Sequence, residues 1–243
     1  MLNPENCLIP YETSPLPSGP WLVFAPHGDD ETYGMGGTLL LARQQAIETN
    51  LIILTDGALG GDRDDLVQLR QMEVAKACEL LGIQNSHNWQ EPDRGLELSE
   101  RLITKAYEAI LQTKAAAVFF PGPMELHPDH RVTAAIVWEA LKRINSNTSA
   151  AVAAYSYEIG VQNPINVLVD ISAQVPAKEK VMAVYASQNT ENNYEELVLA
   201  LDKGRTYTLP AAVSHAEGFY KYTNDQLQLP LREVTQQIIE LYF

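Results

Sequence analysis

The sequence predicts an α/β fold, a three-layer sandwich in which helices cover both faces of a mostly parallel sheet, with a less regular part over about residues 150–243. Two observations support it. Apolar runs of strand length alternate with longer stretches that carry apolar residues at helical spacing. Clusters of histidine and aspartate follow two of the apolar runs, as expected where ligands bind beyond the carboxyl ends of parallel strands.

The N-terminal half carries the alternation most clearly. Residues 21–25 are an unbroken apolar run and predict a buried strand. Ser99 precedes a helical pattern as an N-cap, and Gly82 follows another as a C-cap. Strands are expected at residues 21–25, 51–54, 83–89 and 115–120, the third being the weakest. Helices are expected between them, at about residues 36–47, 69–81 and 99–111, and from residue 127 onwards.

The C-terminal part has shorter and less regular patterns. Strands are expected at residues 150–157 and 166–170, and short helices at residues 178–185 and 194–201. With 243 residues and 46% hydrophobic composition, the chain can bury one full core, and we expect residues 1–243 to form a single domain.

Charge and composition exclude several classes of partner. A net charge of −14 argues against a general nucleic-acid or anionic-membrane binder, although an arginine facing the site would still allow an anionic substrate. No apolar run is long enough to span a membrane, and residues 1–7 do not resemble a signal peptide. Cys7 and Cys78 are expected to be free thiols. These features predict a cytoplasmic protein.

Two motifs carry the functional signal. His27-Gly-Asp-Asp-Glu31 directly follows the first expected strand, and His127-Pro-Asp-His130 follows the strand at residues 115–120. The second motif places two histidines three residues apart where a helical pattern begins, so both imidazoles can face the same way. Because parallel strands end at the same edge of a sheet, the two motifs are expected to converge on one metal site.

A hydrolytic zinc site uses three His or Asp/Glu ligands and leaves a fourth position open for water. His27, Asp30 and His130 fit this set. Asp29 must point away from its neighbour Asp30, so it can act as a general base toward the water. His127 is expected to stabilise the oxyanion and to protonate the leaving amine. Asp129 is expected to lie in the loop or to orient a ligand rather than to react.

The chain resembles the LmbE/PIG-L family of metal-dependent N-deacetylases. The matching pieces are His27-Gly-Asp-Asp-Glu31, Gly36-Gly37-Thr38, Thr55-Asp-Gly57, Arg70-x-x-Glu73, Leu81-Gly82, His127-Pro-Asp-His130, Asp170, Lys178, Tyr185-Ala-Ser-Gln188 and Ala216-Glu-Gly-Phe219. The resemblance implies a Rossmann-like fold and zinc, or iron, held by His27, Asp30 and His130. It also implies that Asp29 is the base and that His127 supports the transition state. The family acts mostly on N-acetylglucosamine units in glycolipids, thiol glycosides and antibiotic precursors.

The chain departs from the family pattern at two positions. Gly28 stands where the family usually has proline, which loosens the turn without removing a ligand. Glu125 stands where some members have a tyrosine that polarises the carbonyl. Either His127 carries the oxyanion alone, or another group such as Tyr33 or Tyr157 helps.

Three further residues are candidates for the site. Arg70 is expected to bind substrate hydroxyls or a phosphate, the alternative being a solvated charge on a helix. Asp93 is expected to be either a sugar-hydroxyl ligand or a turn former. Glu31 is expected to hold a helix start or to orient His27.

The leading functional prediction is a zinc hydrolase that removes acetyl from an N-acetylglucosamine-type conjugate, either soluble or lipid-linked. One alternative is a non-haem iron(II) oxygenase with His27, Asp29 and His130 as its triad, although such enzymes commonly use β-barrels. The other alternative is a metal-binding module with a degenerate site. A homo-oligomer is compatible with the sequence.

Overall fold

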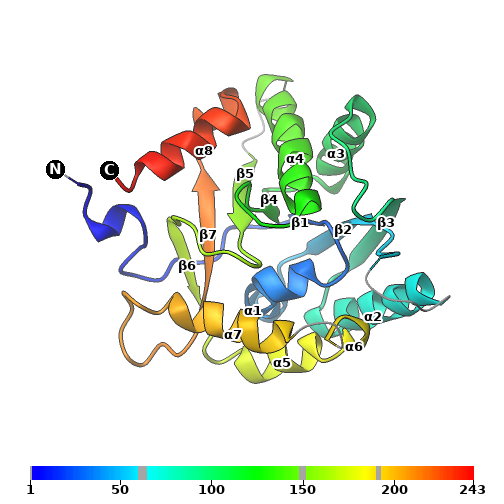
Figure 1. Cartoon of the computed structure of the whole chain (residues 1–243), viewed down its shortest axis with the longest axis horizontal. Coiled ribbons are helices and arrows are strands. Elements are labelled where there is room, and N and C mark those ends of the chain that lie inside the picture. Colours follow the sequence, from blue (N-terminus) through cyan, green and yellow to red (C-terminus); the bar gives the residue numbers. More distant parts are fainter. Residues whose placement is uncertain (1, 60–64, 148–151, 190–192) are drawn as a thin grey trace.

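The structure is a computed structural model that describes residues 2–59, 65–147, 152–189 and 193–243. A seven-stranded sheet with the order β3-β2-β1-β4-β5-β7-β6 forms its middle layer (Figure 1). The strands are β1 (Trp21–Ala25), β2 (Thr49–Thr55), β3 (Asn85–Glu91), β4 (Ala117–Pro121), β5 (Ala153–Tyr157), β6 (Val167–Asp170) and β7 (Ala216–Tyr222). Strands β1 to β5 pair in parallel, whereas β7 is antiparallel to both β5 and β6.

Helices cover both faces of this sheet, as the sequence predicted (Figure 1). One face carries α3 (Glu100–Thr113), α4 (Pro128–Asn147) and α8 (Leu231–Glu240). The other carries α1 (Asp30–Gln44), α2 (Leu66–Leu81), α5 (Val175–Met182), α6 (Ala186–Asn189) and α7 (Tyr194–Gly204). Short 3₁₀ turns occur at Glu5–Cys7 and Gln226–Gln228. The three-layer α/β prediction is confirmed.

Successive side chains of β1 pack alternately into two hydrophobic cores, one on each face of the sheet. Leu22 and Phe24 pack with α3 and α4, whereas Trp21, Val23 and Ala25 pack with α1 and α2. All five side chains are buried, because successive residues of a strand point to opposite faces and both faces are covered. This is why the strand is an unbroken apolar run in the sequence.

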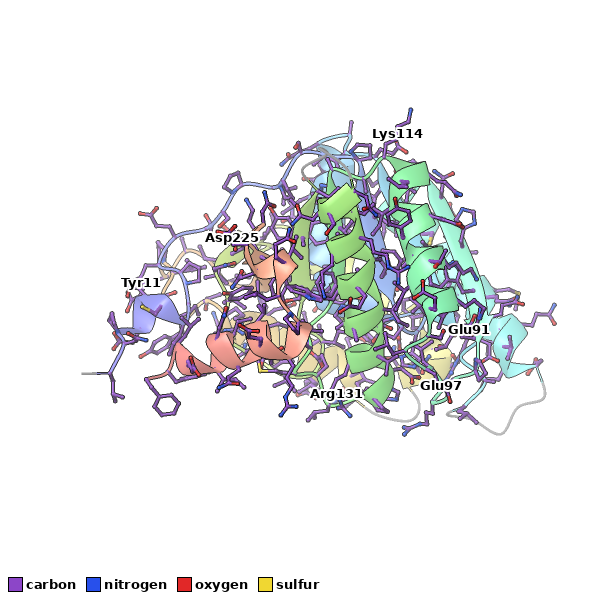
Figure 2. The ribbon with its side chains drawn as sticks, turned by 90° about the horizontal axis from the view of Figure 1, so that it is seen from above. Tyr11, Glu91, Glu97, Lys114, Arg131 and Asp225 are labelled. Carbon is purple, nitrogen blue, oxygen red and sulfur yellow. The ribbon has the colours of Figure 1, made fainter. Side chains whose placement is uncertain are left out.

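The carboxyl ends of the parallel strands lie at one edge of the molecule. Glu91 at the end of β3, Glu97 in the following loop and Arg131 in the first turn of α4 lie near this edge, whereas Lys114 after α3 lies at the opposite end (Figure 2). The loops after β1, β2, β3 and β4 therefore meet at this edge, together with the first turns of α1 and α4. These loops and first turns contain the predicted metal-binding and catalytic residues, whereas Arg70 is in α2.

The C-terminal part departs from the sequence-based expectation. Strand β7 and helix α8 were not expected.

Helix α1 begins at Asp30 rather than near residue 36. Gly34 lies in this helix where it packs tightly on the sheet. A β-carbon at Gly34 would lie 2.3 Å from the ring of Tyr157. Tertiary packing thus explains the glycine better than local flexibility does.

Buried charges join α1, α5, α7 and β7. The Lys178 ammonium is fully buried and lies 2.7 Å from carboxylate oxygens of both Asp202 and Glu217. Glu217 also accepts hydrogen bonds from the backbone N–H groups of Gly37 and Thr38, at 2.8 and 2.7 Å. These contacts fix α1, whose first turn carries the candidate site. In the described part of the chain, no helix is both long enough and apolar enough to cross a membrane.

Candidate active site

The turn between β1 and α1 places three candidate residues side by side. The backbone N–H of His27 donates to Asp30 Oδ2 at 2.9 Å, and His27 Nδ1 lies 3.1 Å from the same oxygen. The carbonyl of Asp29 accepts the N–H groups of Thr32 and Tyr33, each at 2.9 Å, which begins α1. The N-terminus of α1 therefore points its positive dipole end toward the carboxylates.

The presence of glycine rather than a larger residue at position 28 has a steric explanation in this chain. A β-carbon there would lie 2.3 Å from Cγ2 of Val74 in α2. The approach of α2 thus leaves no room for a side chain in the turn, and the glycine removes none of the candidate ligands.

The second motif brings two more imidazoles to the same place from the start of α4. The Nε2 atom of His130 lies 3.3 Å from Asp30 Oδ1. The ring centroids of His27 and His127 are 4.7 Å apart, and those of His127 and His130 are 5.1 Å apart. The structure thus confirms that the two motifs, distant in sequence, meet at one edge of the sheet.

The donor set fits a divalent metal. Asp30 directs one oxygen toward His27 Nδ1 and the other toward His130 Nε2, as an anion between two ligand nitrogens would. His130 Nδ1 is buried without a hydrogen bond in the described chain, and Glu125 Oε2 lies 3.7 Å from it. A metal-binding imidazole is usually oriented by a carboxylate near its other nitrogen. Two other groups of side chains could also hold an ion, His27 with His127 and His130, and His27 with Asp93 and Asp129.

Two carboxylates lie against the far nitrogen of His27. Its Nε2 atom is 3.3 Å from Asp129 Oδ2 and 3.4 Å from Asp93 Oδ1. Burial lowers the pKa of His27, but hydrogen bonds to Asp129, Asp30 and Asp93 raise it to well above its usual value. A proton held on Nε2 by these carboxylates leaves Nδ1 free to bind a metal.

Asp29 lies in the cleft with a perturbed pKa. Burial and the neighbouring charge of Asp30 raise the pKa of Asp29 to about 8. Its carboxylate makes no hydrogen bond within the described chain, in contrast to that of Asp30. A cation beside Asp29 would lower this pKa toward neutrality, which is the range suited to a general base.

His127 is held in one tautomer by the backbone. The N–H of Asp129 donates to His127 Nδ1 at 3.2 Å, so Nδ1 carries a lone pair and the ring proton is on Nε2. Burial and the charges of His27 and His130 lower the pKa of His127, which favours this neutral form. The ring can therefore donate a hydrogen bond from Nε2.

The other sequence-based candidates have varied surroundings. Arg70 lines the cleft, but its guanidinium donates to the carbonyls of Gly57 and Leu59 and, at 3.0 Å, to Gln188 Oε1. Glu31 accepts from Thr32 Oγ1 at 2.6 Å and from Tyr185 OH at 2.5 Å. No hydrogen bond joins Glu31 to His27 in the described part of the chain. Its contacts instead connect the start of α1 to the segment between α5 and α6.

Glu125 occupies the position at which some family members have a tyrosine, and the structure shows what surrounds it. Glu125 accepts the N–H groups of Ile159 and Gly160, at 2.8 and 3.1 Å, and thereby holds the loop after β5. Tyr157 is fully buried and donates to the carbonyl of Phe24, so it cannot reach a substrate. Tyr33 lines the cleft, and its hydroxyl donates to Asn189 Oδ1 at 2.8 Å.

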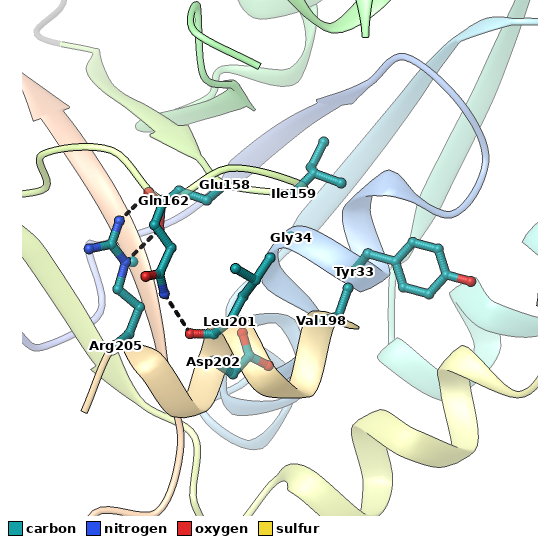
Figure 3. A pocket seen from close by; sticks show the side chains of 10 residues that line it. Tyr33, Gly34, Glu158, Ile159, Gln162, Val198, Leu201, Asp202 and Arg205 are labelled. Atoms are coloured by element: carbon teal, nitrogen blue, oxygen red, sulfur yellow. Dashed lines mark hydrogen bonds and ion pairs between the residues drawn. The ribbon is translucent and has the colours of Figure 1, made fainter. Parts of the chain in front are cut away.

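A cleft of about 580 Å³ opens over these groups. This size is typical of a small-molecule site. The loop after β5 and helix α7 form one wall. Figure 3 shows how this wall is held, with Arg205 paired to Glu158 and the Gln162 amide donating to the Leu201 carbonyl at 2.7 Å.

Comparison with known proteins identifies the family. The model of the PIG-L family, described as GlcNAc-PI de-N-acetylase, matches residues 22–141. A probable N-acetyl-α-D-glucosaminyl L-malate deacetylase 2 of Bacillus anthracis is 31% identical over 183 residues, which are 69% of this chain and 80% of that protein. The diacetylchitobiose deacetylase of Thermococcus kodakarensis is 27% identical over 191 residues, 72% of each chain.

The fold comparison agrees with the sequence comparisons. The structure of the N,N'-diacetylchitobiose deacetylase of Pyrococcus horikoshii superposes with a TM-score of 0.75 over 84% of each chain, at 22% identity. At this level of identity the likeness concerns the fold. Together with the relative of 31% identity, it leads to one conclusion. The chain belongs to the PIG-L family of de-N-acetylases.

Proposed function

We propose that this protein removes the acetyl group from an N-acetylglucosamine-type conjugate, with zinc as its metal. As a PIG-L member the chain is an N-deacetylase, a hydrolase of amide bonds. The observation that carries the proposal is the convergence of His27, Asp30 and His130 beside a carboxylate, Asp29, that has no hydrogen-bond partner in the described chain. The two relatives of similar length act, by their names, on N-acetylated amino sugars.

We assign the metal to His27, Asp30 and His130. When bound there, a zinc ion would supply Lewis-acid polarisation of the amide carbonyl and would lower the pKa of a water molecule. Asp93 and Asp129 would orient His27 through Nε2, and Glu125 would do the same for His130 through Nδ1. Iron(II) remains compatible with the same ligands.

Asp29 acts as the general base. Its carboxylate takes a proton from the attacking water and passes that proton to the departing nitrogen as the amide C–N bond breaks. With Asp29 passing the proton to the nitrogen, His127 is not needed to protonate the leaving amine. Because the Asp129 N–H donates to His127 Nδ1, a doubly protonated ring would lose that hydrogen bond, so His127 serves as an oxyanion donor through Nε2.

His127→Ala is expected to lower kcat by about 10²- to 10³-fold, the usual effect of losing one oxyanion donor. The effect should be at the upper end, because Tyr157 is bonded to Phe24 and cannot replace it. His127→Gln keeps an N–H donor and should recover part of the rate. Zinc content, measured by atomic emission, should be unchanged in both variants. Loss of zinc from His127→Ala would mean that His127 is a ligand.

Arg70→Ala is expected to lower kcat/KM by about tenfold without releasing zinc. The guanidinium holds the loop after β2 through the carbonyls of Gly57 and Leu59, and the Leu59 N–H donates in turn to Asp93. Loss of the guanidinium would therefore displace the wall of the cleft next to Asp93. Steady-state kinetics on an N-acetylglucosaminide would measure the change. Lys76→Ala, an exposed change on the same helix, is the matched control. Wild-type kinetics in Arg70→Ala would remove both the loop-holding role and the substrate-binding role from Arg70.

The test of the function is acetate release from a panel of N-acetylglucosamine conjugates and N-acetyl peptides. We expect release from the conjugates and little from the peptides. The iron oxygenase alternative predicts instead that 2-oxoglutarate is consumed in air, and the binding-module alternative predicts no turnover at all. Cytoplasmic location and single-domain organisation stay predictions, which cell fractionation and limited proteolysis would test.

A further inference from the structure

Arg94 stands apart from the other charged residues of the cleft. It is exposed, it lines the cleft, and its guanidinium has no hydrogen bond or ion pair among the described residues. Arg70, the other described cation of the lining, donates to carbonyl groups and is only 7% exposed. Other described cations, such as Lys114 and Arg232, also have no acidic partner, but they do not line the cleft.

The backbone of Arg94 is held in an uncommon conformation. Its φ is 55°, in the left-handed region that a residue with a side chain rarely adopts. The turn is closed by the Gly95 N–H, which donates to the Pro92 carbonyl at 3.1 Å. Conformations of this kind persist where the surroundings fix them, and they are frequent at ligand-binding sites.

Hydrogen bonds fix this turn to the catalytic loops. The Arg94 N–H donates to Asp129 Oδ2 at 2.8 Å, and Asp129 lies against His27. The neighbouring Asp93 accepts the Leu59 N–H at 3.1 Å. The α-carbon of Arg94 is therefore fixed relative to His27, although the residue belongs to a loop.

The remaining lining offers no other cation to an anionic ligand. Apart from the histidines and the two arginines, its described members are acidic, apolar or uncharged. The acidic members are Asp29, Asp30, Asp93 and Glu125. Arg94 is the guanidinium of the described lining that is free to form the paired hydrogen bonds by which this group binds carboxylates and phosphates.

We infer that the substrate carries an anionic group, a carboxylate or a phosphate, on the part attached to the amino sugar, and that Arg94 binds it. This inference rests on the proposed function and adds a specificity-determining residue to it. Arg94 takes no part in the chemistry, and its contact selects the substrate through binding. The preference is therefore expected in KM rather than in kcat.

The test uses two pairs of N-acetylglucosaminides that differ in charge but little in shape. One pair is carboxymethyl and carbamoylmethyl, and the other is 2-phosphoethyl and 2-hydroxyethyl. Wild type should show about fivefold higher kcat/KM for the charged member of at least one pair, an effect consistent with one exposed charge contact. The pair that shows it identifies the anion as carboxylate or phosphate. The preference should fall as salt rises.

Variants assign the preference to the side chain. Arg94→Met should abolish it, Arg94→Lys should retain part of it, and Arg232→Met, an exposed change on α8 outside the cleft, should leave it intact. Methionine and lysine share the backbone restriction of arginine, so the turn is matched. Equal kcat/KM within both pairs for wild type, or a preference that survives Arg94→Met, would overturn the inference.

A binding measurement separates this inference from the deacetylase proposal. Calorimetry with the corresponding glucosamine conjugates, which need no turnover, should show tighter binding of the charged member to wild type and equal binding to Arg94→Met. Absence of acetate release with this binding preference intact would refute the proposed reaction alone. Acetate release without any binding preference would refute the role of Arg94 alone.

Discussion

His130→Ala is expected to lose its zinc and about three orders of magnitude or more of its turnover. The metal supplies several kcal/mol of transition-state stabilisation, and each 1.36 kcal/mol is a factor of ten in rate. His130 Nε2 lies 3.3 Å from Asp30 Oδ1, and its ring is buried at the start of α4, so its loss removes one of the three assigned ligands from the centre of the site. Zinc content and acetate release would be measured on the same sample.

The matched control for this change is His87→Ala. His87 is an exposed histidine on β3 that does not line the cleft, so its variant should keep both zinc and activity. Circular dichroism would show whether His130→Ala is folded. A folded His130→Ala that retains stoichiometric zinc and normal turnover would contradict the assignment of His130 as a ligand.

Asp29→Asn is expected to keep zinc and to lose about two to four orders of magnitude in kcat, the usual contribution of a general base. The amide has nearly the same shape but cannot accept the proton of the attacking water. Burial and Asp30 hold the pKa of Asp29 well above its usual value, which shows how strongly this site acts on the group. Pre-steady-state acetate release would separate the chemical step from product release.

Asp225→Asn is the matched control for Asp29→Asn. Asp225 is exposed and lies outside the cleft, so the same chemical change there should leave kcat unaltered. Near-normal turnover in Asp29→Asn would assign Asp29 a purely structural role. Loss of zinc would instead identify it as a ligand in place of Asp30.

The sequence predicted the elements whose pattern depends on local geometry. Trp21–Ala25 has strand length and is wholly apolar because both of its faces are covered. Strand β7 was missed because Glu217 and Gly218 are untypical of a buried strand. Only the tertiary structure shows that Glu217 pairs with Lys178 and with two backbone N–H groups. Helix α8 carried a usable signal, with Val234 and Ile238 four residues apart after Pro230.

The candidate site was predictable where its residues follow strand ends. The meeting of His27 with His130 follows from a parallel sheet, and the structure confirms it. The surroundings of Arg70 and Glu125 were not predictable, because they depend on loops such as Gly57–Leu59 and Ile159–Gly160. Arg94 was missed altogether, since an arginine in a Pro-Asp-Arg-Gly turn is indistinguishable by sequence from an ordinary surface charge.

The location of the metal tests the central claim most directly. The structure offers three ligand sets that share His27, and anomalous diffraction at the zinc edge would distinguish them. We expect one zinc peak at about 2.0–2.2 Å from His27, Asp30 and His130, the usual distances for nitrogen and oxygen ligands. A peak held by His27, Asp93 and Asp129, or by all three histidines without Asp30, would contradict the account.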